Sequence, residues 1–190
     1  MTNNTPTQAR SLTDLAGTYT IDAAHSRIGF TARHAMVTKV RGSFNDFAGT
    51  ATIDGEDLSR SSATLTIQAT SIDTRSDQRD EHLRSNDFLD MDTYPQISFV
   101  STAVRATSPT TLEVTGDLTI KGKTNTVTVP FEFEGTATDP FGNQRLGFEG
   151  SLTINRKDYD ITWNAALETG GVLVSEKIGL ELEISAIKTA

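Results

Sequence analysis

The residues with the clearest chemical potential lie in one short stretch, "RSDQRDEHLRSNDFLDMDTYP", at positions 75–95. It combines His82 with three arginines and a run of carboxylates, a mixture that could bind a cation or support acid–base catalysis. Asp87, Asp90 and Asp92 are spaced loosely like calcium ligands. An EF-hand loop also requires a glycine at its sixth position and a glutamate at its twelfth, and neither is present. The spacing therefore argues against a calcium site.

The chain has three histidines, His25, His34 and His82, which together could hold zinc or iron. No His-x-His or His-x-x-x-His pattern is present, so hydrogen bonding to turn backbone is the simpler interpretation. His34 is the best candidate for ligand contact because it follows an apolar face at a strand end. A metal- or acid–base-dependent enzyme that uses the three histidines stays open as the alternative hypothesis.

Nucleophilic catalysis finds no sequence support. The chain contains no cysteine and no Gly-x-Ser-x-Gly motif. The "GKT" at 122–124 lacks the upstream glycine of a phosphate-binding loop and lies in a predicted hairpin. We therefore predict no enzyme activity, assign no catalytic residue or metal ligand, and expect no cofactor.

Local signals around His82 predict a short helix over residues 76–86. Ser76 can cap its N-terminus, Asp80 faces Arg84 one turn later, and Asn86 can end the helix in a left-handed conformation. Leu83 is its main apolar contact, with Phe88 and Leu89 just beyond. This pattern predicts an amphipathic helix followed by an apolar plug.

Most of the remaining chain alternates between apolar and polar residues, which indicates about eight long strands joined by hairpins. The apolar residues switch between odd and even positions near residues 22–25 and again at Asn45-Asp46. Each switch predicts a bend that keeps the apolar side chains of both halves of the strand facing inward. Long alternating strands in a chain of this size favour a closed all-β, up-and-down antiparallel barrel over a sandwich.

Length and charge limit the remaining possibilities. The 190 residues suit one domain, predicted at 16–190, after a polar and flexible arm at 1–15. A net charge of −8 without a basic tract argues against nucleic-acid binding. The chain has no apolar run long enough to span a membrane and no secretory signal, so we expect a cytoplasmic location.

Large apolar residues fall mostly on predicted inward faces, and they could either fill the barrel or line a cavity. Small residues on the same faces, which leave room inside, favour a cavity; these are Ala32, Gly42, Gly49, Ala51 and Gly116.

Six blocks in order resemble the YceI-like family of lipocalin-like, polyisoprenoid-binding proteins. They run from about residue 18 to the C-terminus and read "YTIDAAHSRIGFTARH", "GSFNDFAG", "RDEHLRSNDFLDMDTYPQISF", "GDLTIKGKT" and "DPFGNQRLGF" with "NRKDY". One departure is Asp160, where the family pattern would have glycine.

The resemblance implies an eight-stranded antiparallel lipocalin-like barrel that binds a long-chain isoprenoid, quinone- or prenylphenol-like, in its lumen. It also implies a homodimer, and many relatives are periplasmic. The predicted ligand-binding residues are Phe30, His34, Phe44, Phe47, Phe88, Phe99, Leu118, Phe131, Phe148 and Trp163. A third hypothesis is a filled barrel that acts through protein contacts.

Overall fold

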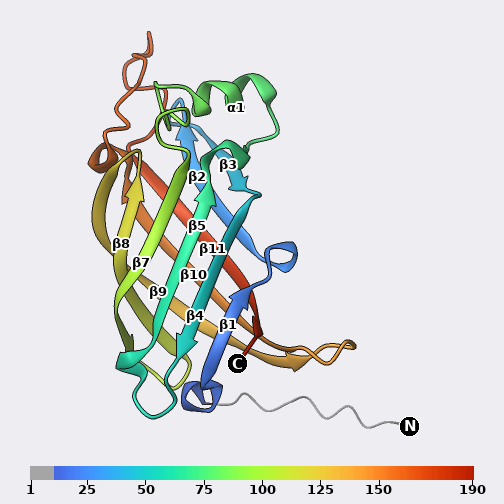
Figure 1. Cartoon of the computed structure of the whole chain (residues 1–190). Coiled ribbons are helices and arrows are strands. Elements are labelled where there is room, and N and C mark those ends of the chain that lie inside the picture. The colour runs from blue at the N-terminus through green and yellow to red at the C-terminus, as the bar shows by residue number, and fades with distance from the viewer. Residues whose placement is uncertain (1–10) are drawn as a thin grey trace.

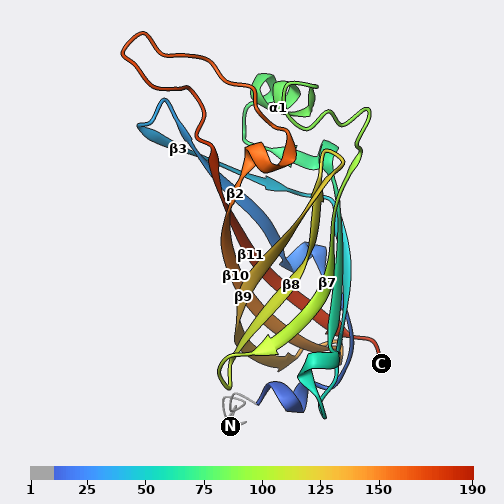
Figure 2. The same ribbon diagram turned by 90° about the vertical axis from the view of Figure 1, so that its left-hand side faces the viewer.

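A computed structural model describes residues 11–190 of the chain. Eleven β-segments form one sheet that curls into a barrel, with the short helix α1 (Asp77–Arg84) at one end (Figures 1 and 2). The segments are β1 (Gly17–Ile21), β2 (Arg27–His34), β3 (Thr38–Phe44), β4 (Phe47–Ile53), β5 (Ser62–Gln68), β6 (Ile72–Asp73), β7 (Gln96–Ala106), β8 (Thr111–Ile120), β9 (Lys123–Thr138), β10 (Gln144–Asn155) and β11 (Lys177–Lys188).

The eleven segments amount to eight barrel strands because three strands are interrupted once. β1 and β2 both pair with β11 and are separated by the 3-10 helix η2 (Ala23–His25). β3 and β4 are separated by Asn45 and Asp46, and β5 and β6 by η4 (Ala69–Ser71). The two predicted bends are therefore confirmed, as is the predicted fold class.

Antiparallel pairing runs continuously around the barrel. The order is β1-β4-β5-β7-β8-β9-β10-β11, and β11 then pairs with β1 through Tyr19 and Lys188 to close the ring. Closure leaves the barrel wall without a free edge strand there. The predicted hairpin at Gly122 is also confirmed: Lys121 and Gly122 both have positive φ, as a two-residue hairpin turn of this type requires.

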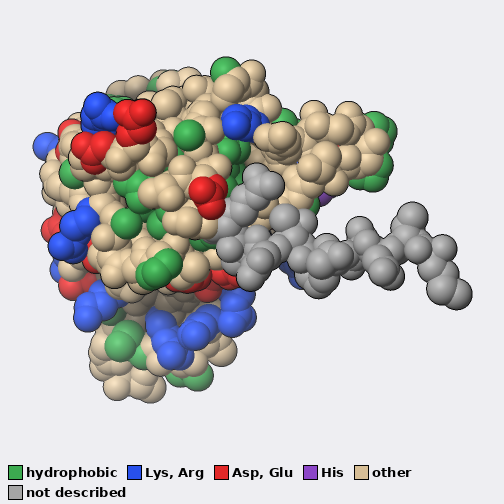
Figure 3. Space-filling model, turned by 90° about the horizontal axis from the view of Figure 1, so that it is seen from below, with side chains coloured by type: hydrophobic (Ala, Val, Ile, Leu, Met, Phe, Trp, Pro, Cys, Tyr) green, Lys and Arg blue, Asp and Glu red, His purple; other side chains and the backbone are tan. Residues whose placement is uncertain are grey.

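The two ends of the barrel are built differently. At one end lies α1, together with the 3-10 helix η5 (Arg156–Tyr159), while η1 (Leu12–Leu15) lies at the other (Figure 2). Seen from the η1 end, the surface carries Lys/Arg and Asp/Glu side chains interspersed with hydrophobic ones (Figure 3). No helix within residues 11–190 has the length and hydropathy needed to cross a bilayer.

Two boundaries differ from expectation. Residues 1–10 of the predicted arm lie outside the described residues, but Leu12 and Leu15 are buried in η1, so the assignment of residues 11–15 to the arm is wrong. The last strand begins only at Lys177, although the apolar alternation already starts at Val172 and Val174. Residues 171–176 instead belong to a loop that folds back on itself, where Ala166 pairs with Val172.

Candidate ligand-binding lumen

The barrel encloses a cavity of about 330 Å³ whose wall is almost wholly apolar. Every barrel strand contributes inward side chains to this wall, and Leu83, Phe88 and Leu89 contribute from α1 and the loop after it. The volume lies within the roughly 300–1,000 Å³ of small-molecule pockets. The fold therefore has a lined lumen rather than a completely filled core.

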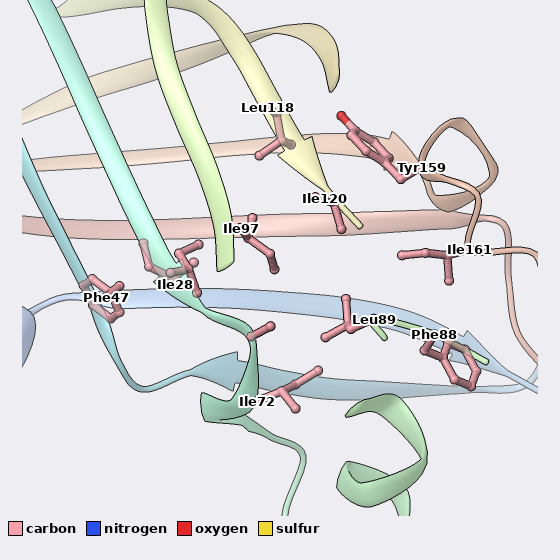
Figure 4. Close-up of a cluster of buried hydrophobic side chains, with 12 residues drawn as sticks. Ile28, Phe47, Ile72, Phe88, Leu89, Ile97, Leu118, Ile120, Tyr159 and Ile161 are labelled. Carbon is pink, nitrogen blue, oxygen red and sulfur yellow. The ribbon is translucent and has the colours of Figure 1, made fainter. Parts of the chain in front are cut away.

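Most of the large apolar lining residues belong to two packed clusters, one toward each end. The cluster toward α1 includes Ile97, Ile120 and Ile161, which converge from β7, β8 and the segment after η5 (Figure 4). The cluster toward η1 includes Leu12, Leu15 and Tyr19. Because the cavity wall draws on both clusters, the apolar space extends along the barrel rather than occupying one end.

An aromatic group holds the loop after α1 against the α1 end of the barrel. The His82 ring meets Phe88 at 5.0 Å and Trp163 at 4.8 Å, both nearly edge-on, and Phe88 lies 5.3 Å from Trp163. His82 Nε2 also lies 2.8 Å from Asp87 Oδ2. The predicted apolar plug after α1 is present, and Phe88 and Leu89 are its buried members.

The charged residues of the 75–95 stretch fix the helix to the barrel. Asp80 is buried and accepts hydrogen bonds from the Thr74 backbone N–H at 2.9 Å and from Thr74 Oγ1 at 2.6 Å. Arg84 donates to the backbone oxygens of Thr70 and Ile72, so the predicted Asp80–Arg84 pair is wrong. The helix starts after Ser76 as predicted, but Asn86 lacks the predicted left-handed conformation and Ser85 is the C-terminal cap. These contacts give the stretch a structural role.

Seven of the ten predicted ligand-binding residues lie on the cavity wall. They are Phe30, Phe44, Phe88, Phe99, Leu118, Phe131 and Phe148. Their contact with a ligand stays a prediction.

The other three predicted residues lie elsewhere. Phe47 is buried in the α1-end cluster but does not reach the cavity, and Trp163 packs on His82 and Phe88. His34 is exposed, and its backbone pairs with Val174. His34 has the inward parity of Phe30, but the β2–β3 hairpin extends past the barrel rim there (Figure 2).

The predicted role of the inward glycines needs correction. Gly42, Gly49 and Gly116 do not line the cavity, because neighbouring side chains cover them. A Cβ on Gly116 would lie 2.5 Å from Phe99 Cζ, and one on Gly49 would lie 2.6 Å from Ile21 Cδ1. These glycines therefore seat larger side chains against the wall, whereas Ala32 and Ala51 do face the cavity as predicted.

The three histidines do not form a joint site. His25 Nδ1 lies 2.7 Å from Asp22, His82 pairs with Asp87, and His34 lies at the exposed rim. Within residues 11–190, His, Asp and Glu side chains form no group of three or more suited to a metal ion. The alternative hypothesis, an enzyme that uses the three histidines together, therefore loses its proposed metal ligands.

Sequence reasoning missed two polar residues of the lumen, Arg156 and Tyr159, although both lie in the quoted "NRKDY" block. Arg156 is 3% exposed and donates to four backbone oxygens, those of Ile161, Trp163, Val174 and Ser175, at 2.8–3.3 Å. Arg156 thereby ties the segment after η5 to the barrel.

Tyr159 is 1% exposed, and burial raises the pKa of its hydroxyl while the nearby Asn125 side chain opposes that rise. Asn125 Nδ2 donates to the Asp158 backbone oxygen at 2.8 Å. Among the described residues, the Tyr159 hydroxyl makes no hydrogen bond of good geometry, and the Asn125 side chain is the polar group that interacts with it.

Asp160, the one departure from the family pattern, ends η5 in a left-handed conformation with φ 56°. Aspartate tolerates this region better than most non-glycine residues do. The turn that glycine would make is therefore kept.

The closed eight-stranded antiparallel barrel and its apolar lumen define a lipocalin-like protein. Residues 19–186 match the YceI-like domain, and the chain belongs to the YceI-like family. The UPF0312 protein SAS2572 of Staphylococcus aureus is 43% identical over 164 residues, which cover 86% of this chain and 93% of that protein.

Solved structures show the same architecture. BcnA of Burkholderia cenocepacia aligns with a TM-score of 0.76 at 27% identity, covering 87% of this chain and 98% of that one. The Campylobacter jejuni YceI protein aligns with a TM-score of 0.71 at 25% identity, covering 83% and 90%. A polyisoprenoid-binding domain from Saccharophagus degradans has a TM-score of 0.69 at 15% identity, covering 90% and 98%, and shares the fold.

Proposed function

We propose that this protein binds a long-chain isoprenoid lipid, quinone- or prenylphenol-like, in the barrel lumen and acts as its carrier or sequestering protein. The observation that carries the proposal is the apolar cavity of about 330 Å³ that extends through both core clusters. Membership of the YceI-like family supports it, and so does the shared fold of a domain described as polyisoprenoid-binding.

The physical chemistry of the wall suits such a ligand. An isoprenoid tail is almost entirely hydrocarbon, and each CH₂ group moved from water to an apolar wall contributes about 0.8 kcal/mol. Arg156 is the one charged residue among the described lining residues, so nearly the whole wall can accept a hydrocarbon chain without leaving a charge desolvated. Binding of this kind requires no catalytic group.

The proposal is tested by titrating lipid-depleted protein with a ubiquinone analogue that carries a decyl tail. Trp163 is the only tryptophan and packs at the α1 end, so quenching of its fluorescence by the quinone reports binding. Coelution of the quinone with the protein on gel filtration confirms it. We expect saturable, near-stoichiometric binding by the wild type.

Two variants change the lumen in opposite ways. Phe44→Asp places a charge on the cavity wall, and Ala51→Phe fills the space while keeping the wall apolar. We expect at least tenfold weaker quinone binding by both, whereas Glu181→Gln on the exposed face of β11 should bind like the wild type.

The Ala51→Phe variant keeps the test valid if Phe44→Asp does not fold, and circular dichroism identifies which variants are folded. Unchanged binding by folded Ala51→Phe would rule out the lumen as the site. An equal loss in Glu181→Gln would do the same.

A further inference from the structure

The β2–β3 hairpin ends in an exposed apolar tip beyond the barrel rim. Met36 is 60% exposed and Val37 is 74% exposed. The tip joins the loop between η5 and β11, because the Ala35 backbone N–H donates to the Leu173 oxygen at 2.7 Å. Val172, the residue before Leu173, is exposed as well. Figure 2 shows both segments projecting past the wall at the α1 end. We call Met36, Val37 and Val172 the rim patch.

The turn at this tip is built from residues that do not suit it. Ala35 and Met36 both have positive φ, 50° and 63°, and the Val37 N–H donates to the His34 oxygen at 3.0 Å. A two-residue turn of this kind favours Asn-Gly, because both residues tolerate positive φ. The β8–β9 hairpin at the same end has Gly122 in its turn. The alanine and the exposed methionine cost stability in the free protein, which points to a role outside the fold.

The two strands that carry this tip are basic in an otherwise acidic chain. The chain has 25 Asp and Glu residues and a net charge of −8, but none of these carboxylates lies between Asp22 and Asp46. Arg33, Lys39 and Arg41 share the outer face of the hairpin, and Arg33 lies directly opposite Lys39. Within residues 11–190 none of the three forms an ion pair. Like charges placed side by side repel, so this face favours an anionic partner.

Most of the acidic side chains at this end lie on other elements. Asp77 and Glu81 are on α1, which Figure 2 shows on a different side of the rim from the hairpin. Glu176 is paired with Lys157. Glu168 is the single carboxylate within residues 165–175. An anionic surface can therefore approach the hairpin while α1 is turned away from it.

We propose that the rim patch and the cations behind it dock the protein on an anionic lipid bilayer. Met36 and Val37 enter the boundary between head groups and acyl chains, and Arg33, Lys39 and Arg41 stay among the lipid phosphates. Apolar side chains flanked by Lys and Arg bind such surfaces because burial and charge attraction act together. Docking there would bring the α1 end of the lumen to the bilayer. This inference goes beyond the proposed function and requires no ligand in the lumen.

The test is flotation of the lipid-depleted full chain with vesicles. One set contains equal parts of phosphatidylcholine and phosphatidylglycerol, and the other contains phosphatidylcholine alone. We expect the wild type to float with the anionic vesicles only. Its binding should weaken as salt is added, because salt screens the attraction between the exposed cations and the lipid phosphates.

Three variants locate the docking surface. Ala35→Asn/Met36→Gly removes the exposed methionine and supplies the residues that the turn favours, so it should melt no lower than the wild type and bind anionic vesicles about tenfold more weakly. Lys39→Gln should bind them about fivefold more weakly. Phe141→Ser is the matched control, since Phe141 is 90% exposed between β9 and β10 at the opposite end of the barrel, and it should bind like the wild type.

The quinone titration separates docking from lumen binding. The double variant should keep the wild-type affinity for the quinone, because its changes lie outside the cavity wall. Docking by a wild type that takes up no quinone would overturn the lumen function and leave the docking surface standing.

Three outcomes would overturn the docking proposal and leave the lumen function untouched. The first is a wild type that does not float with anionic vesicles, and the second is a double variant that floats as the wild type does. The third is an equal loss in Phe141→Ser. If the wild type does not float but forms a dimer that the double variant dissociates, the rim patch is an interface between two copies of the chain.

Discussion

The ring of Phe30 covers Gly42 on the neighbouring strand. The two residues are direct partners in the β2–β3 register, and a Cβ added to Gly42 would collide with the ring. A phenyl ring laid over a glycine is a recurring way to fill a strongly coiled sheet without leaving backbone exposed. The ring is thereby held at the wall and also forms part of it.

Replacing this glycine should therefore disturb both packing and binding. We expect Gly42→Ala to lower the free energy of unfolding by about 1–3 kcal/mol, because the methyl group forces Phe30 away from the wall. Displaced into the lumen, the ring should also weaken lipid binding. Gly147→Ala is the matched control. The new Cβ there would lie 3.6 Å from Glu134 Cβ, which is an ordinary van der Waals distance. Equal urea-denaturation midpoints for the two variants would contradict this assignment.

The 3-10 helix η1 should behave as part of the barrel rather than as an arm. Leu12 is 2% exposed in the cluster with Leu15 and Tyr19, so Leu12→Ala should cost about 2–5 kcal/mol in urea denaturation. Thr13→Ala, at an exposed position of the same helix, should change stability by less than about 0.5 kcal/mol. A small effect of Leu12→Ala would show that η1 does not close this end.

Arg156 should be intolerant even of lysine. A single ammonium group cannot span the four backbone oxygens that the guanidinium reaches, so Arg156→Lys leaves buried acceptors unpaired. We expect a loss of about 2–4 kcal/mol. Lys157→Gln removes an exposed ion pair with Glu176 and should have a much smaller effect. Comparable losses in the two variants would mean that Arg156 does not organise the segment.

Low pH should reduce the stability that the ion pairs of Arg145 with Asp139 and Asp22 contribute. Hydrogen bonds from Asn143 and Arg145 lower the pKa of Asp139 far below its usual range, and Arg145 followed by His25 lowers the pKa of Asp22. Below the usual Asp pKa of about 3.9 the unfolded chain binds more protons than the folded one, so this stabilisation is lost as pH falls toward the folded pKa.

Asp139→Asn should consequently be less stable than the wild type at pH 7, and the difference should shrink at pH 3. Denaturation curves at the two pH values measure it, with Glu168→Gln at an exposed carboxylate as the control. A difference that stays constant or grows toward pH 3 would contradict the assigned role of Asp139.

The wall of the barrel was predictable because strand alternation is a local signal. Parity changes located the bends at η2 and at Asn45-Asp46, and they placed Phe30 and Phe44 on the inner face. The alternation of a strand shows which face of the sheet a residue occupies, but it does not show where along the barrel axis that residue lies. His34 therefore has the parity of the inner face while lying beyond the rim, and Phe47 faces inward without reaching the cavity.

The polar features of the lumen depend on contacts between distant segments. Arg156 donates its hydrogen bonds to backbone oxygens 5 to 19 residues further along the chain, and the "NRKDY" motif contains no local signal that predicts those partners. The 75–95 stretch shows the reverse case. Its charges suggest chemistry, yet Asp80 and Arg84 are used to bind backbone and neighbouring side chains.

The central claim is that the lumen holds an isoprenoid lipid, and mass spectrometry of an organic extract of freshly purified protein tests it most directly. We predict one dominant, near-stoichiometric prenyl lipid, and that its yield falls sharply in Ala51→Phe purified in parallel. A blank extract from folded wild-type protein that also fails to take up added isoprenoid lipid would contradict the claim.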